Sequence, residues 1–329
     1  MDATSSFHDP GPLRKADGLY FNDCGLILRA EDVLFRVSGE FLAVNSTFFR
    51  DLLSLPQPAD AERMDGCLVA RVPDTAEEMT AFLKALLYSS FFESPPAATT
   101  FEVLAPILRL SHKYDVPWLH KRALAHLSLT HPTTLSGWEN LLSIPNSFIR
   151  NSDTNRCLAV ISLARDLSLD WVLPVAFYRL ARTRSATVIF ASDLLMSDKL
   201  RWAEAVRKID TELRSQALDF LWEPKRIAGC TNEPPRLCTE MRAAYRKSVD
   251  KVRFSTSPNA GYLMPLETWT AGWWTAMQDT NKVCEVCMGE MKRLKALADE
   301  AFWQALPEIF DLGTWAELEQ QKQAVFTDG

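Results

Sequence analysis

The stretch that decides the fold of the first part of this chain is FRVSGEFLAVNSTFFRDLL, residues 35–53. It begins inside an apolar run, Val33–Val37, which predicts a β-strand. From residue 40 the apolar positions change to helical spacing, so residues 40–53 are predicted to be helical. Asn45 and Ser46 interrupt this spacing with side chains that commonly cap helix N-termini, which predicts a cap at this point.

Further strands are predicted on both sides of this stretch. Short apolar runs at residues 19–21 and 25–28 precede it. The polar residues 30–32 supply the turn of a hairpin between 25–28 and 33–37. Residues 67–72 return to a strand pattern after a polar loop. These runs together predict a small sheet.

Helices follow the predicted sheet. After Asp74 or Thr75, either of which can act as the N-cap, apolar side chains from Met79 onward recur with a helical period and form one stripe. Thr99, with Glu102 three residues later, predicts a capping box for the next helix. Pro106 lies inside that pattern and should kink the helix or move its start later. Residues 118–129 are predicted to form a further helix.

The run from Phe35 to Leu53 resembles the BTB/POZ domain, whose pattern reads F-x-V-H-x-x-x-L-A-x-x-S-x-x-F. The segments around Asp65–Val72, Leu86–Tyr88 and Ile107–Val116 continue the same order of elements. The amino-acid sequence of these segments is most similar to that of BTB proteins of mushroom-forming fungi. The resemblance covers residues 17–128. Ser38 stands where the family has a histidine that helps to lock the first helix onto the sheet.

The resemblance implies an α+β module, a small sheet flanked by helices that is frequently dimeric and serves protein–protein contact. We therefore divide the chain into a disordered segment 1–16, a BTB/POZ-like domain 17–130 and a mostly α-helical C-terminal domain 131–329. Leu19, Phe21 and Phe41 are candidate interface residues, although a core position explains them equally well.

The C-terminal part has the periodicity of a helical domain. Helical stretches are predicted at residues 155–167, 173–182 and 192–221. Residues 226–270 are richer in Pro, Gly, Ser and Thr and are predicted to be loop-like. A long amphipathic helix is expected at 279–302, with one side lined by Val283, Cys287, Leu294, Leu297, Ala298 and Ala301.

The sharpest chemical signal is a set of four cysteines within residues 230–287. Cys284 and Cys287 form a CxxC that opens a predicted helix, where two thiolates can face one metal ion. Cys230 and Cys238 could complete a tetrahedral site for one structural zinc ion. Their spacing of seven residues exceeds the usual two to four. The alternative is four unrelated thiols, and a redox CxxC is disfavoured because no βαβ pattern surrounds it.

Other chemistry-bearing residues have plainer explanations. His112 and His120 flank a helix turn but lack carboxylate or thiol partners, so we interpret them as surface or partly buried residues. Trp269, Trp273 and Trp274 are interpreted as core or interface aromatics. The basic run at residues 242–253 is interpreted as a solvated helical face.

The composition, and the motifs that the sequence lacks, disfavour several classes of protein. The 329 residues are 47% hydrophobic and carry a net charge of −6, which disfavours a nucleic-acid groove. No GxGxxG or GxxxxGK pattern and no nucleophile–base constellation is found, so we expect no enzyme. No apolar run reaches the ~20 residues that a bilayer requires. The N-terminus has no signal-peptide pattern, and seven scattered cysteines indicate a reducing compartment, in the cytoplasm or nucleus.

The expected function is that of a non-enzymatic adaptor that binds protein partners and self-associates through its BTB-like domain. Two alternatives remain open. The first is a substrate adaptor of a cullin-type ubiquitin ligase, because some BTB proteins have that role. The second is a transcriptional regulator with a C-terminal zinc module, which would require salt-dependent DNA binding.

Overall fold

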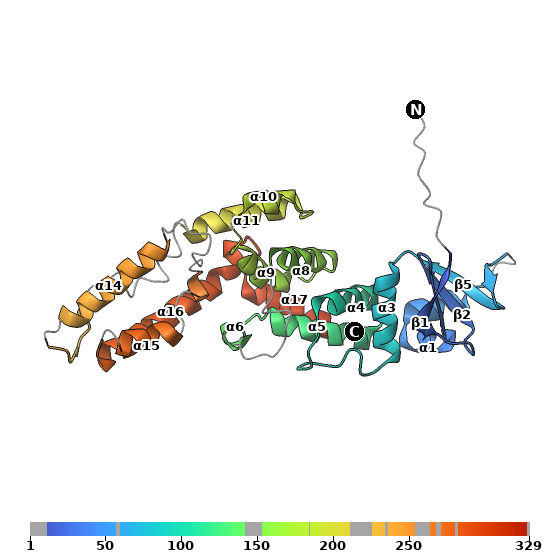
Figure 1. Ribbon diagram of the computed structural model, residues 1–329, viewed down its shortest axis with the longest axis horizontal. Coiled ribbons are helices and arrows are strands. Elements are labelled where there is room, and N and C mark those ends of the chain that lie inside the picture. The colour runs from blue at the N-terminus through green and yellow to red at the C-terminus, as the bar shows by residue number, and fades with distance from the viewer. Residues whose placement is uncertain are drawn as a thin grey trace, which may run out of the picture. The chain divides into compact units, whose positions relative to one another are not determined.

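The computed structural model describes residues 12–56, 60–141, 153–183, 185–210, 226–233, 236–253, 264–267, 271–279 and 282–327. These residues form two compact units. The first contains residues 12–130, 141 and 324–327, and the second contains 131–140 and 153–323. A mixed α/β architecture is confirmed, with one sheet near the N-terminus and helices after it (Figure 1). Residues 1–11 of the predicted disordered segment 1–16 lie outside the described residues.

The first unit is built on a five-stranded sheet with the strand order β1-β3-β2-β5-β4. β2 (Leu26–Ala30) and β3 (Val33–Val37) form the predicted antiparallel hairpin. β1 (Arg14–Tyr20) pairs in parallel with β3, and β5 (Cys67–Val72) pairs in parallel with β2. The two-residue strand β4 (Arg63–Met64) pairs with β5 and is too short to leave a sequence pattern.

The start of the sheet differs from the prediction. β1 begins at Arg14 rather than Leu19, so the last residues of the predicted disordered segment 1–16 belong to the sheet. Most of this strand is exposed and polar, because it lies at an edge of the sheet, and it therefore lacks the apolar alternation by which strands are recognised. Phe21 follows the strand and is half-buried.

Two serines start the two short helices that follow the sheet. Ser38 caps α1 (Gly39–Asn45), and its hydroxyl oxygen accepts the Phe41 backbone N–H at 3.2 Å. Ser46 caps α2 (Thr47–Ser54) and accepts the Phe49 N–H at 3.0 Å, which confirms the predicted cap. The Ser46 hydroxyl also donates to the backbone carbonyl of Tyr114.

Ser38 and Gly39 have a local structural role at the start of α1. Ser38 satisfies a backbone N–H of the first turn of α1, which an N-cap serine does well. Gly39 then lies close to α2, because a Cβ added there would be 3.1 Å from Leu53 Cδ1. The Ser38–Gly39 pair thus combines a capped start with a close helix–helix approach.

Three longer helices complete the first unit: α3 (Ala76–Leu87), α4 (Phe101–Lys113) and α5 (Pro117–Thr130). Thr75 caps α3, as one of the two predicted alternatives. The capping box predicted at Thr99 is wrong by one residue, because Thr100 is the N-cap of α4 and its side chain makes no capping hydrogen bond. Pro106 lies inside α4 without moving its start.

The core of the first unit forms where α2, α3 and the end of α4 meet. Phe49 stacks on Tyr114 with ring centroids 5.0 Å apart, and Phe82 lies 5.6 Å from the same ring. The Tyr114 hydroxyl donates to Asp74, so its polar end is satisfied inside the core. Leu19 is 0% exposed and also belongs to the core.

The described residues of the second unit form helices joined by turns and loops, without a strand (Figure 1). Its elements are α6 (Leu135–Asn140), α8 (Thr154–Asp166), η2 (Asp170–Val172), α9 (Leu173–Leu180), α10 (Ala186–Ala191), α11 (Met196–Lys208), α14 (Arg236–Arg253), η4 (Pro265–Glu267), α15 (Ala271–Asp279), α16 (Glu285–Ile309) and α17 (Trp315–Thr327) up to residue 323. Stacked aromatic pairs hold its centre, with Trp303 on Trp315 and Phe177 on Phe310.

Three sequence predictions for the second unit are corrected. A helix was expected over residues 192–221, but α11 starts only at Met196, after a loop. Residues 211–221 of the expected helix lie outside the described residues. The segment 226–270, expected to be loop-like, contains the long helix α14. The helix expected at 279–302 is not continuous, because Lys282 adopts a left-handed backbone conformation with φ of 52° and α16 begins only at Glu285. Leu297, expected on the apolar side, is exposed.

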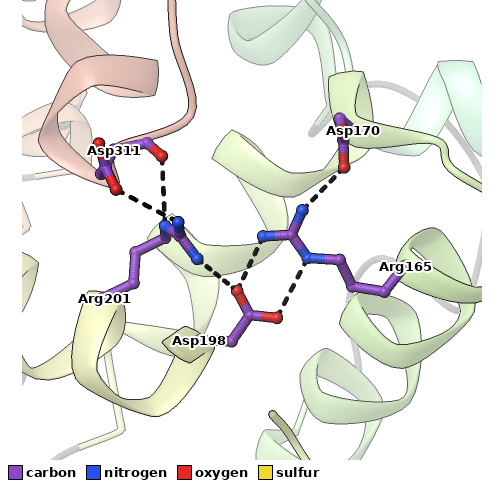
Figure 2. Close-up of polar contacts among 5 residues, drawn as sticks. All are labelled: Arg165, Asp170, Asp198, Arg201 and Asp311. Atoms are coloured by element: carbon purple, nitrogen blue, oxygen red, sulfur yellow. Dashed lines mark hydrogen bonds and ion pairs between the residues drawn. The ribbon is translucent and has the colours of Figure 1, made fainter. Parts of the chain in front are cut away.

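A network of ion pairs connects four segments of the second unit (Figure 2). The Asp198 carboxylate in α11 is 1% exposed and accepts two hydrogen bonds from Arg165 of α8 and one from Arg201. Arg165 also pairs with Asp170 at 2.8 Å, and Arg201 pairs with Asp311 at 3.3 Å. Asp198 and its two arginines thus connect α8, η2, α11 and the residues after α16.

Candidate metal centre

The four predicted cysteines of the C-terminal part come together in space. Cys230 lies in a turn, Cys238 on the first turns of α14, Cys284 at the N-cap of α16 and Cys287 on its first turn. All four Sγ atoms lie within 4.8 Å of one another. Among the residues that the structure describes, no other group of three or more His, Cys, Asp or Glu side chains has this arrangement.

The sulfur geometry fits a tetrahedral thiophilic ion better than it fits disulfides. A zinc ion with Zn–S bonds of ~2.3 Å requires S···S separations of ~3.8 Å. The Sγ atoms of Cys284 and Cys230 are 3.8 Å apart. A disulfide would need ~2.05 Å, and all four cysteines are free thiols. The four sulfurs therefore need a contraction of about 1 Å at most to reach the tetrahedral arrangement.

Local structure explains how such distant cysteines meet. The N-cap and N3 positions of α16 place Cys284 and Cys287 at the same helix end, as the CxxC spacing predicts. The first pair lacks that spacing. Asn232 bridges the gap instead, because its side-chain amide donates to Cys238 Sγ at 3.1 Å and to the Lys282 carbonyl at 2.8 Å. This asparagine ties the two halves of the cluster together.

Burial and hydrogen bonds shift the pKa values of Cys238, Cys284 and Cys287 in different directions. Burial would raise the pKa of Cys284, but the backbone N–H groups of Cys287 and Thr231 outweigh it and lower the pKa to about 6. Burial raises the pKa of Cys238, although the Cys284 N–H points at its sulfur from 3.4 Å. Burial and the neighbouring thiols raise the pKa of Cys287. A bound cation would offset the cost of ionising all four.

Apolar side chains surround the four sulfurs. The buried members of this shell are Met277, Val283, Met288 and Met291, and the partly buried ones are Ile227, Met241, Tyr245, Trp274 and Leu294. This cluster is where α14, α15 and the start of α16 pack together. A small core of this kind is typical of elements that a structural metal holds together.

Arg242 is the clearest error of the sequence interpretation. It was assigned to a solvated basic face, but it is only 3% exposed and lies one helical turn after Cys238 on α14. Cys238, Met241, Arg242 and Tyr245 follow helical spacing, and the charged member hid the apolar stripe of α14. Asn232 and Thr231 were also missed, since a single polar loop residue leaves no pattern in the sequence.

The other candidate residues do not build a site in the described structure. His112 and His120 lie side by side, with ring centroids 5.3 Å apart and His112 exposed. Leu19 is buried in the core of the first unit, which was the alternative left open for it, whereas Phe41 is exposed and stays a candidate for an interface. Trp269 and the side chain of Trp273 lie outside the described residues.

None of the described helices combines the length and the apolar content needed to cross a bilayer. No family model, no curated protein and no solved structure matches this chain.

Proposed function

We propose that this chain is a non-enzymatic interaction protein of the BTB/POZ type, whose first unit pairs with a second copy of the chain. The resemblance around Phe35–Leu53 and the sheet flanked by helices support the proposal. The observation that carries it is a group of exposed apolar side chains on α1, α2 and the start of α5, namely Phe41, Val44, Phe48 and Trp118.

This exposed group is ordered by its own contacts. Asn45 donates to the Phe41 carbonyl at 2.9 Å and accepts the Trp118 indole N–H at 3.1 Å, so α1 and α5 present their apolar side chains together. Val44 is 85% exposed and therefore contributes little to the monomer core. Ordered aromatic and aliphatic side chains of this kind are typical of the buried centre of a protein interface.

Self-association is tested by size-exclusion chromatography with light scattering, which gives the mass of the eluted protein. A dimer interface needs about 1,200–2,000 Å² of buried surface. We expect the wild type to have twice the monomer mass, and Val44→Asp to weaken or abolish the dimer without unfolding it. Leu200→Asp, the same kind of apolar-to-charged change at an exposed position of α11, should leave the mass unchanged. A wild type that is monomeric at tens of micromolar would contradict pairing with a second copy.

We also propose that the cysteine cluster binds one structural zinc ion. Cys230, Cys238, Cys284 and Cys287 would hold it, and the ion would fix α14 to the start of α16. Elemental analysis of the purified protein should give one zinc per chain, lost in Cys284→Ser. Cys24→Ser removes a partly buried thiol of the first unit and should keep the zinc. No metal, or a metal that survives Cys284→Ser, would contradict the proposal.

A further inference from the structure

Asn232 lies where the two halves of the cysteine cluster meet. It follows Cys230 by two residues and is half-buried. Its side-chain Nδ2 lies 3.1 Å from Cys238 Sγ and 2.8 Å from the backbone carbonyl oxygen of Lys282, which precedes Cys284 by two residues. One amide group therefore joins the loop of Cys230, helix α14 and the turn before α16.

The two acceptors fix the orientation of this amide. A backbone carbonyl accepts hydrogen bonds and never donates them, so the NH₂ group of the Asn232 side chain, and not its Oδ1, has to face Lys282. The NH₂ group has two N–H donors, which leaves the second one for Cys238 Sγ. Both donors thus have an acceptor within hydrogen-bond distance. The reverse orientation would place two oxygen acceptors against each other.

The sulfur of Cys238 benefits most from such a donor when it is a thiolate. Cys238 is 2% exposed, so water contributes little to the solvation of its sulfur. Hydrogen bonds to an ionised acceptor are the stronger ones, and a buried charge is costly unless it is hydrogen-bonded or paired. The Cys284 backbone N–H lies 3.4 Å from the same sulfur. Two N–H groups, one from a side chain and one from the backbone, thus support a metal-bound thiolate at Cys238.

The same hydrogen bonds arrange the ligands before an ion binds. Cys230 and Cys238 lack the short spacing of a usual ligand pair, so other contacts have to hold the loop between them. Asn232 lies in that loop, and its bond to Lys282 spans 50 positions of the sequence. A site whose ligands are already ordered loses less conformational entropy when the ion binds.

We propose that Asn232 is a positioning residue of the zinc centre, one that does not bind the ion but raises the affinity of the four cysteines for it. Its amide holds the two halves of the cluster together and donates a hydrogen bond to the Cys238 thiolate. Partners of metal ligands commonly contribute in both ways. This inference rests on the proposed zinc site.

The test measures zinc affinity in the full chain by competition with a chromogenic chelator. Asn232→Leu keeps the branched shape of the side chain but removes both donors, and we expect it to weaken zinc binding by about 10- to 100-fold. Glu233→Ala is the matched control in the same loop, because this side chain is exposed, and it should leave the affinity within about twofold. Equal affinities of Asn232→Leu and the wild type would overturn the inference.

Cobalt(II) substitution provides a readout that a merely space-filling role would not change. The thiolate-to-cobalt charge-transfer bands should indicate four sulfur ligands in the wild type and in Asn232→Leu, since Asn232 is not a ligand. Their energy should be lower in Asn232→Leu, because a thiolate that loses a hydrogen bond gives electron density to the metal more readily. Bands at the same energy in both proteins would also overturn the inference.

A second variant covers the case in which Asn232→Leu does not fold. Asn232→Asp keeps the size and polarity of the loop residue, but its carboxylate only accepts hydrogen bonds. We expect it to bind zinc at least about 10-fold more weakly than the wild type. An affinity equal to that of the wild type would overturn the role of the amide.

The zinc centre and the role of Asn232 fail in distinguishable ways. A folded wild type that binds neither zinc nor cobalt refutes the zinc centre, and the role of Asn232 falls with it. A wild type that binds zinc through Cys284, with no dependence on Asn232, leaves the zinc centre in place and refutes only the positioning role.

Discussion

Asp198→Ala removes the carboxylate on which two arginines converge in the second unit. Asp198 is 1% exposed, and it accepts hydrogen bonds of 2.8 and 3.1 Å from Arg165 and 2.7 Å from Arg201. Removing one partner of a buried ion pair costs about 3–5 kcal/mol. Both arginines reach water and keep Asp170 or Asp311, so we expect the lower end, about 3 kcal/mol.

The assay is thermal unfolding followed by tryptophan fluorescence. Every tryptophan except Trp118 lies after Thr130, so the signal reports mainly on the second unit. For a unit of this size, a loss of 3 kcal/mol lowers the melting temperature by about 6–12 °C. Asp311→Asn is the matched control, since this carboxylate is 92% exposed and should contribute less than about 1 kcal/mol, and asparagine tolerates the left-handed backbone conformation of residue 311, whose φ is 51°. Equal melting temperatures for the two variants would refute the reasoning.

Three further predictions test other parts of the structure. Ser46→Ala loses the cap of α2 and the bond to the Tyr114 carbonyl, so urea unfolding of the first unit should show a loss of about 2 kcal/mol. Burial and the charge of His112 lower the pKa of His120 to about 4, whereas the unfolded imidazole titrates near ~6.5. The folded state then binds fewer protons, so stability should fall as the pH drops from ~6.5 towards 4, and urea midpoints at pH 7 and pH 5 should differ less in His120→Gln. Treatment with a strong chelator should lower the melting temperature of the wild type reversibly, with zinc restoring it, and should leave Cys284→Ser unchanged.

Local patterns determined much of the first unit. The hairpin, the cap at Ser46 and the stripe that starts at Met79 are each set by residues near in sequence, because turns, caps and amphipathic faces depend on neighbours within a few positions. β1 was misplaced because an exposed edge strand needs no apolar alternation. Its place beside β3 is a long-range pairing that only the folded chain decides.

The cysteine cluster shows the same division more sharply. The pairing of the two cysteines of the CxxC at the start of α16 could be predicted from the sequence, since both thiols lie within one helical turn. The approach of Cys230 and Cys238, the bridge from Asn232 and the burial of Arg242 depend on how α14 packs against α16. The residue types were thus present in the sequence, but the meeting of the four sulfurs is a property of tertiary packing, because it joins residues that are far apart along the chain.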